Sequence, residues 1–299
     1  MDMIIEQLNG ASERWFATMQ LIAWQAVVVF AFARFATMLL RRYGPAITFW
    51  IWTASAAKIA SQLVVPMVLA IPFWQVSNAS HSTVVAKRMD LPTSVTITQP
   101  VRDIIPQSPS LTGRAVLFVI WAAIVLLQLI LIVMRRRALS QMLRWIRPAS
   151  ATDRARLDAL RSRLDVRFPV SLGRADVGSP FVTGIIRPRI VLPLDLKTTN
   201  SPTELDHVLL HELAHIKRRD LLWAWIPEIT RVILFFHPVV YWISQEAQLH
   251  REAACDQAVV LSVGGAKDYA QTLLTFSKRS RSLRESDQHK LDLAFAGSE

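Results

Sequence analysis

Long apolar stretches dominate the first half of the chain. Residues 15–40 carry one charge, at Arg34, and residues 115–134 carry none. A further apolar stretch, 47–74, contains one lysine and two prolines. About twenty consecutive apolar residues form a helix long enough to cross the hydrocarbon core of a bilayer. The pattern therefore predicts three transmembrane helices.

Arginines at the ends of these stretches predict their orientation. Arg41 and Arg42 follow the first stretch, and the arginine run 135–137 follows the stretch 115–134. Lysine and arginine accumulate in the cytoplasmic segments that flank transmembrane helices. We therefore expect both arginine groups in the cytoplasm, and the N-terminus and the polar loop 75–113 on the opposite side of the membrane.

The second half of the chain has the pattern of a small α+β domain. Leucines at helical spacing predict a surface helix over 152–165, and short β-branched runs separated by glycine and proline predict strands between 167 and 193. A helix start is predicted at Ser201, with Pro202 in the first turn and Glu204 at the capping-box position.

Together these elements predict a mainly α membrane protein. Its transmembrane region covers residues 1–137, and a small α+β domain covers residues 138–299. Hydrophobic residues make up 52% of the chain, although the net charge is +11. Because the basic residues lie beside apolar runs, the lipid bilayer and its anionic headgroups are the expected partner, and no direct contact with nucleic acid is expected.

The most informative motif is His211-Glu212-Leu213-Ala214-His215. On a helix, His211 and His215 lie one turn apart on the same face, where two imidazoles can bind one zinc ion. Glu212 is then placed to act as a general base that activates water. By itself the motif also fits an ordinary amphipathic helix with two histidines at its edge.

A catalytic zinc usually has three protein ligands, so a further residue is needed. We interpret Glu252 as the third ligand and expect Asp256, one turn later, to orient a zinc-binding histidine through its free ring nitrogen. The alternative interpretation of this acidic pair is a solvated surface. Cys255, Glu246 and His250 are further candidates, although Cys255 points to a different helix face from Glu252, and a lone cysteine among alanines is more often a core residue.

This ligand set constrains the apolar segment 221–243. It is long enough to cross a bilayer, which would place His215 and Glu252 on opposite sides of the membrane. Two prolines, at 227 and 238, interrupt the segment, and a Glu–Arg pair lies near its middle. We therefore expect a re-entrant or membrane-surface helical hairpin rather than a fourth span.

Four residues could stabilise an oxyanion, and the sequence does not choose among them: His237, Tyr241, His250 and Arg251. A histidine before proline, as at 237, also commonly caps or packs. By analogy with zinc peptidases that carry this motif, a peptide substrate is expected to bind as an added strand along residues 181–192.

Four segments in the same order resemble the BlaR/MecR family of membrane zinc peptidases. They are 177–193, the motif 211–215 with Lys217-Arg218-Arg219-Asp220, the segment 235–242, and Arg251-Glu252-Ala253-Ala254-Cys255-Asp256. The resemblance implies a gluzincin-type endopeptidase in the bacterial cytoplasmic membrane, with the active site facing the cytoplasm. It implies one zinc ion per chain, bound by His211, His215 and Glu252, with Glu212 as the base.

The resemblance also implies that the substrate is a cytoplasmic transcription repressor, with self-cleavage as a further possibility. The basic segment 278–284 is a candidate linker, lipid-facing patch or cleavage site. The chain departs from the family's sensor members because it contains neither a penicillin-binding domain nor a clear final span; we expect either a truncated piece or a branch without that sensor. Two alternatives stay open: a quality-control peptidase of the HtpX type, and a non-catalytic zinc-binding sensor or scaffold.

Overall fold

The computed structural model describes residues 2–68, 110–194, 196 and 202–275. The described chain is mainly helical and also contains a four-stranded sheet. The principal helices are α1 (Asp2–Leu40), α2 (Pro45–Val68), α3 (Gly113–Met142), α4 (Ala151–Arg163), α6 (Pro202–Arg218), α7 (Asp220–Trp223), α8 (Trp225–Ile233) and α9 (Pro238–Val263). Residues 266–275 are helical as well.

Two helices are long and apolar enough to cross a membrane. They are Asp2–Tyr43, which contains α1, and Gly113–Trp145, which contains α3. The most apolar part of the second helix has no buried residue, as expected for a helix in contact with lipid. The described part of the third predicted span, α2, does not meet the same criteria, and residues 69–74 lie outside the described chain; a third span stays a prediction.

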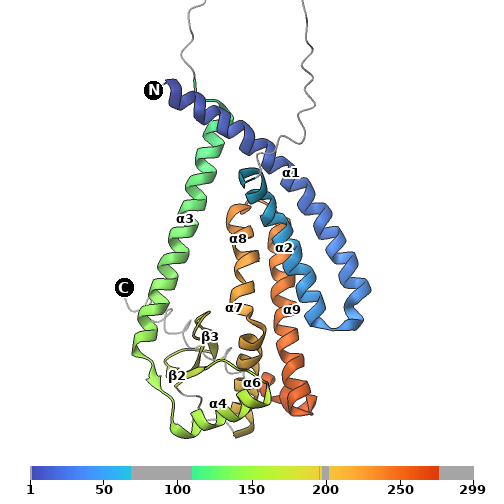
Figure 1. The fold of residues 1–299 in the computed structure, drawn as a ribbon, viewed down its shortest axis with the longest axis vertical. Helices are drawn as coiled ribbons and strands as arrows, with labels where there is room; N and C mark the ends of the chain where they lie inside the picture. Colours follow the sequence, from blue (N-terminus) through green and yellow to red (C-terminus); the bar gives the residue numbers. More distant parts are fainter. Residues whose placement is uncertain (1, 69–109, 195, 197–201, 276–299) are drawn as a thin grey trace, which may run out of the picture.

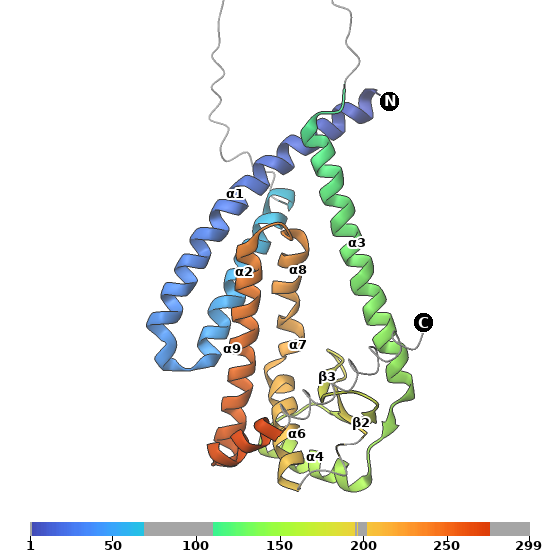
Figure 2. The same ribbon diagram turned by 180° about the vertical axis from the view of Figure 1, so that it is seen from behind.

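The helices α1, α2, α8 and α9 lie side by side, as both views of the ribbon show (Figures 1 and 2). Their shared core is apolar and includes the fully buried side chains of Ile22, Trp52, Ile59 and Ile243. This packing joins two regions that are far apart in the sequence. The domain boundary expected near residue 137 stays a prediction.

The apolar segment after α6 folds back on itself. α8 runs toward the N-terminal end of α1 and α9 returns, with the chain reversing between Leu234 and His237 (Figure 1). Pro238 occupies the first turn of α9, a position where proline's missing N–H costs no helical hydrogen bond. The expected helical hairpin is therefore present in the chain path, and both ends of it return to the same end of the molecule.

α3 contacts the helical bundle at one end and then diverges from it (Figure 2). The rings of Trp15, Phe118 and Trp121 form an aromatic cluster with centroid distances of 5.4–6.0 Å. The indole Nε1 of Trp121 donates a hydrogen bond to the carbonyl oxygen of Ile233, at 2.9 Å. The tip of the α8–α9 hairpin is thus attached to the predicted outer half of α3.

The small sheet has the strand order β1-β2-β4-β3. Its strands are β1 (Arg147–Pro148), β2 (Ser171–Ala175), β3 (Phe181–Thr183) and β4 (Arg189–Pro193). β2 and β4 pair in parallel, and β3 pairs antiparallel with β4. The short strands predicted between 167 and 193 are confirmed, and β3 lies at an edge of the sheet.

α4 and α6 pack with this sheet around one hydrophobic core (Figure 1). α4 agrees with the predicted surface helix, and it begins earlier because the hydroxyl of Ser150 accepts a hydrogen bond from the backbone N–H of Asp153. Leu209 and Leu213 of α6 are fully buried in this core. α6 begins at Pro202, while the predicted N-cap, Ser201, lies outside the described residues.

Candidate active site

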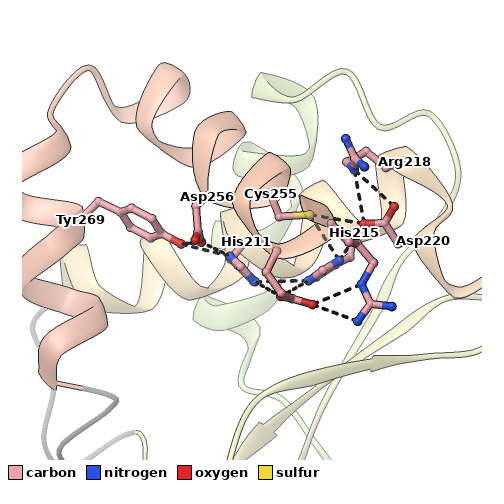
Figure 3. A network of polar contacts seen from close by, with 9 residues as sticks. His211, His215, Arg218, Asp220, Cys255, Asp256 and Tyr269 are labelled. Carbon is pink, nitrogen blue, oxygen red and sulfur yellow. Dashed lines mark hydrogen bonds and ion pairs between the residues drawn. The ribbon is translucent and has the colours of Figure 1, made fainter. Parts of the chain in front are cut away.

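α6 places the two motif histidines at the surface of the core. Leu209 and Leu213 anchor one face of the helix, so His211 and His215 project from the adjoining face toward α9 (Figure 3). The Nε2 atoms of the two imidazoles are 3.2 Å apart. The i, i+4 spacing of the two histidines therefore brings their Nε2 atoms together at one position.

Glu252 of α9 faces the same position. Its Oε2 lies 3.6 Å from Nε2 of His211 and 3.4 Å from Nε2 of His215. A tetrahedral zinc ion with bonds of about 2.0–2.1 Å holds its ligand atoms about 3.3 Å apart. Two imidazoles and one carboxylate at these distances therefore fit a catalytic zinc site with a fourth position left for water or substrate.

Each histidine turns its other nitrogen toward a carboxylate. Oδ1 of Asp256 lies 3.1 Å from Nδ1 of His211, and Oδ2 of Asp220 lies 2.8 Å from Nδ1 of His215 (Figure 3). Such contacts fix the ring orientation and the tautomer that leaves Nε2 free to bind a metal. An orienting role for Asp256 was expected. Asp220 was not assigned a role, although it closes the Lys-Arg-Arg-Asp segment that carries part of the family resemblance.

The helical segment 266–275 contacts α6 through two hydroxyl groups, those of Tyr269 and Thr272. The hydroxyl of Tyr269 donates a 2.7 Å hydrogen bond to Oδ1 of Asp256 and lies 3.0 Å from Nδ1 of His211. Three residues on, the hydroxyl of Thr272 lies 2.8 Å from Nδ1 of His207, which is buried in the core. No motif pointed to Tyr269 or Thr272, because their partners are more than ten residues away in sequence.

Cys255 is fully buried beside His215, but behind the proposed ligand atoms. Its Sγ lies 3.3 Å from Nδ1 of His215 and 3.4 Å from Oδ2 of Asp220. The thiol therefore meets the ring nitrogen that faces away from Glu252. Cys255 was expected to point to a different face of the helix from Glu252, and its thiol indeed contacts the opposite side of the His215 ring.

The carboxylates around the site change the proton affinity of the histidines. Burial works against a charged imidazole, but contacts with Asp256 and Glu252 outweigh it and raise the pKa of His211 to about 9. Burial is likewise outweighed at His215, where Asp220, Cys255 and Glu252 raise the pKa to about 12. Protons and a metal ion thus compete for the same two Nε2 atoms.

Glu212 lies in the same cavity, and its surroundings suit a proton acceptor. Its side chain is only 7% exposed, and burial raises the pKa of the carboxyl above its ordinary value. A raised pKa brings a carboxylate closer to the range in which it can both accept and return a proton.

A cavity of about 1170 Å³ surrounds these groups. Its lining comes from five parts of the chain, which are the end of α3, the β3 strand with the turn after it, α6, the α7 region and α9. The edge strand Phe181–Thr183 forms one wall, and His211, Glu212, His215 and Glu252 lie in the floor. An open strand edge beside a group of metal-binding atoms can accept an extended peptide.

The four residues considered for oxyanion stabilisation lie in different places. Arg251 lines the cavity, and its Nη2 lies 2.9 Å from Oε1 of Glu252. His250 faces α2, where its Nδ1 lies 3.0 Å from the hydroxyl of Thr48. His237 and Tyr241 lie at the tip of the α8–α9 hairpin, and the Tyr241 hydroxyl donates to the carbonyl of Phe235. Of the four, Arg251 alone lines the cavity.

Glu246, a further candidate ligand, also lies away from the histidine pair. Its Oε1 is 3.1 Å from Nη1 of Arg34 on α1, and its Oε2 is 3.6 Å from Nε2 of His250. It lines a separate pocket between α1 and α9. Among the described residues, two groups of three potential ligand atoms occur, one formed by His211, His215 and Glu252 and the other by His215, Asp220 and Cys255, and Glu246 belongs to neither.

Comparison with known proteins agrees with this geometry. The chain is 36% identical over 118 residues to the "Regulatory protein BlaR1" of Bacillus licheniformis, covering 38% of this chain and 20% of the relative. It is 29% identical over 86 residues to the "Methicillin resistance mecR1 protein" of Staphylococcus aureus strain Mu50, covering 29% of this chain and 15% of the relative. The matches thus span about a fifth or less of these relatives. The family model described as BlaR1 peptidase M56 matches residues 16–291, and the chain belongs to this family of peptidases.

Proposed function

We propose that the protein is a membrane-embedded, zinc-dependent endopeptidase whose active site faces the cytoplasm. One observation carries the proposal: Nε2 of His211, Nε2 of His215 and Oε2 of Glu252 lie 3.2–3.6 Å from one another, which is the spacing of tetrahedral zinc ligands. Membership of a peptidase family supports the same chemistry. His211, His215 and Glu252 would hold one zinc ion.

The residues of the chain then take distinct roles in amide hydrolysis. Bound zinc supplies Lewis acidity, which polarises the scissile carbonyl and makes water a stronger acid. Glu212 accepts the proton of the attacking water and returns it to the leaving amine, a role for which its burial and raised pKa prepare it. Arg251 lies in the same cavity and is the best placed of the four candidates to stabilise negative charge on the carbonyl oxygen.

The substrate is proposed to be a protein segment in extended form. The exposed edge of β3 lines the cavity and offers backbone groups for pairing with such a segment. A cytoplasmic transcription repressor is the proposed substrate, because the relatives named above are a regulatory protein and a resistance protein. Self-cleavage at 278–284 is a weaker proposal, and that segment lies outside the described residues.

The arginines at the end of α3 support a site on the cytoplasmic side. Arg135, Arg136 and Arg137 end the apolar part of α3, and Arg136 itself lines the cavity. If the positive-inside rule sets the orientation of α3, the cavity lies at the cytoplasmic face of the membrane.

A non-catalytic zinc scaffold is the main alternative, and a quality-control peptidase of the HtpX type is another. Glu212 argues against the scaffold, because a structural zinc site needs no buried carboxylate beside its first ligand. A structural site also tends to be closed by four protein ligands, whereas this ligand group opens into a large cavity.

The decisive experiment separates metal binding from cleavage. The protein is purified in lipid nanodiscs, and zinc content and cleavage of a candidate repressor are measured for wild type, Glu212→Gln, Glu252→Gln and Glu246→Gln. We expect Glu212→Gln to keep zinc and lose cleavage by about 10²–10⁴-fold, since a general base contributes that much. Glu252→Gln should lose zinc, and Glu246→Gln, which lies outside the cavity, should resemble wild type.

Two results would contradict the proposal. Full zinc content in Glu252→Gln would remove Glu252 from the ligand set. Undiminished cleavage by Glu212→Gln would remove Glu212 from the mechanism and favour a contaminating activity or a different base.

A further inference from the structure

Three arginines line the cavity that contains the proposed zinc ligands. Arg136 comes from the end of α3, Arg187 from the turn between β3 and β4, and Arg251 from α9. The acidic residues of the lining are Glu212, Asp220 and Glu252. All three carboxylates lie in or next to the histidine pair, so the outer walls of the cavity carry positive charge only.

Two of the arginines keep their charge available for a ligand. Arg251 is paired with Oε1 of Glu252, at 2.9 Å. Arg136 and Arg187, by contrast, are exposed, and neither makes an ion pair within the part of the chain that the structure describes. Two guanidinium groups without an ion-pair partner among the described residues, one from α3 and one from the turn after β3, therefore line the same cavity.

The surroundings hold both arginines in place. The guanidinium carbon of Arg136 lies 4.3 Å from the centre of the Trp225 ring, a stacking contact that orients the group and leaves its N–H donors free. Arg187 belongs to the tight turn 184–188, where Gly184 has a φ of 85° and any Cβ would lie 2.4 Å from the carbonyl oxygen of Arg187. The turn thus fixes the backbone from which the Arg187 side chain extends.

We propose that Arg136 and Arg187 select substrates with acidic residues beside the cleaved bond. This inference rests on the proposed peptidase function and names the class of peptide that the site prefers. A segment paired with β3 and continued past Thr183 runs along the turn that carries Arg187, while Arg136 faces it from α3. Guanidinium groups bind carboxylates through paired, charge-assisted hydrogen bonds, which makes arginine suited to this selection.

An anionic lipid headgroup is the competing ligand, because Arg136 directly follows the apolar part of α3. The peptide is favoured by the position of the charges. Both arginines line the same cavity as His211, Glu212 and Glu252, and the edge strand β3 lines that cavity as well. A headgroup would need no open strand edge and no metal-binding atoms.

The test compares matched peptides in binding and in cleavage. One fluorescent peptide has an apolar centre flanked by glutamates, and its twin has glutamines instead. Binding is measured by fluorescence anisotropy with zinc-loaded Glu212→Gln protein in phosphatidylcholine nanodiscs, so that it does not depend on catalysis. Cleavage of both peptides is measured with wild-type protein.

We expect the glutamate peptide to bind about tenfold more tightly at low ionic strength, with a difference that shrinks as salt screens the charges. Arg136→Gln and Arg187→Gln should each reduce this preference, and the charge reversal Arg187→Glu should shift it toward a lysine-flanked peptide, a gain that misfolding cannot produce. Arg189→Gln is the matched control. Arg189 begins β4, its Nε donates to the hydroxyl of Ser171, and it does not line the cavity.

The test distinguishes failure of this inference from failure of the proposed peptidase function. A glutamate preference that depends on Arg136 and Arg187 supports the inference even where wild-type protein cleaves neither peptide, a result that would count against the peptidase alone. Equal binding of the two peptides overturns the inference, as does a preference that survives both substitutions. If the substitutions leave peptide binding in phosphatidylcholine nanodiscs unchanged and have an effect only when the nanodiscs contain phosphatidylglycerol, the arginines are assigned to lipid, which also overturns the inference.

Discussion

Oδ2 of Asp220 lies 2.8 Å from Nδ1 of His215, five residues earlier in the chain. The backbone makes this contact possible, because Arg219 adopts a left-handed conformation with a φ of 56°, which ends α6 and turns Asp220 back toward the helix. Asp220 is 2% exposed and also accepts a hydrogen bond from Nε of Arg218, at 3.2 Å. The carboxylate is therefore held firmly against the histidine ring.

Asp220→Asn should weaken zinc binding by about 10–100-fold, the usual effect of removing an orienting carboxylate from a metal-binding histidine. The amide keeps the size of the side chain but removes its charge. Zinc affinity is measured by competition with a chelating dye. Asp158→Asn, an exposed position on α4 that pairs with Arg161, is the control and should not change affinity. Unchanged affinity in Asp220→Asn would show that His215 does not depend on this contact.

The second orienting contact carries a similar prediction at Tyr269. Tyr269→Phe removes the hydroxyl that donates to Asp256 and lies 3.0 Å from Nδ1 of His211, while the ring keeps its place in the buried core. We expect zinc affinity to fall by up to about tenfold, less than for Asp220→Asn, because Asp256 still contacts His211 directly. Tyr43→Phe, at an exposed tyrosine beside Arg42, should have no effect.

Asp220 and Tyr269 also show what the sequence could and could not predict. His211, Glu212 and His215 are readable because their relation is local: the helical repeat alone brings them together. Glu252 required a chemical argument, namely that zinc needs a third ligand. Tyr269 gave no signal, because its contact depends on how residues 266–275 pack against α6, which no local pattern specifies.

The membrane region shows the same limit. The apolar run 115–134 is readable as a span because its hydropathy is uninterrupted. The hairpin in 221–243 followed from the requirement that His215 and Glu252 meet, together with the two prolines and the Glu–Arg pair inside the segment, because its length and hydropathy suit a crossing helix equally well. α2 packs between α1 and α9 around Trp52, so part of its apolar surface serves packing between helices, and hydropathy alone does not separate that use from contact with lipid.

The raised pKa values of the two histidines predict a steep pH dependence of zinc binding. The carboxylates around His211 and His215 raise the pKa of both imidazoles and so favour their protonated forms when no metal is bound. Zinc must displace these protons, so its affinity should rise with pH and fall as the solution is acidified, by up to about tenfold per pH unit for each proton displaced.

Chelator competition between about pH 6 and pH 9 measures this slope. Asp220→Asn should flatten the profile, because Asp220 contributes most among the contacts that raise the pKa of His215. An affinity that is independent of pH, or that falls as pH rises, would contradict the assignment of the two histidines as ligands.

The orientation of the helices predicts which surface positions are accessible from outside the cell. Met3, near the start of α1, is 68% exposed, and Trp145, just after α3, is 86% exposed. In a background in which the buried Cys255 is replaced by alanine, Met3→Cys should react with a membrane-impermeant thiol reagent on intact cells. Trp145→Cys should react only after the membrane is opened, because the arginines at 135–137 favour a cytoplasmic position for that end of α3. Both positions are similarly exposed, so a difference in labelling reports the side of the membrane rather than burial.

The reverse labelling pattern would place the cavity, with Arg136 and the histidine pair, outside the cytoplasm, and a cytoplasmic repressor could then not be its substrate.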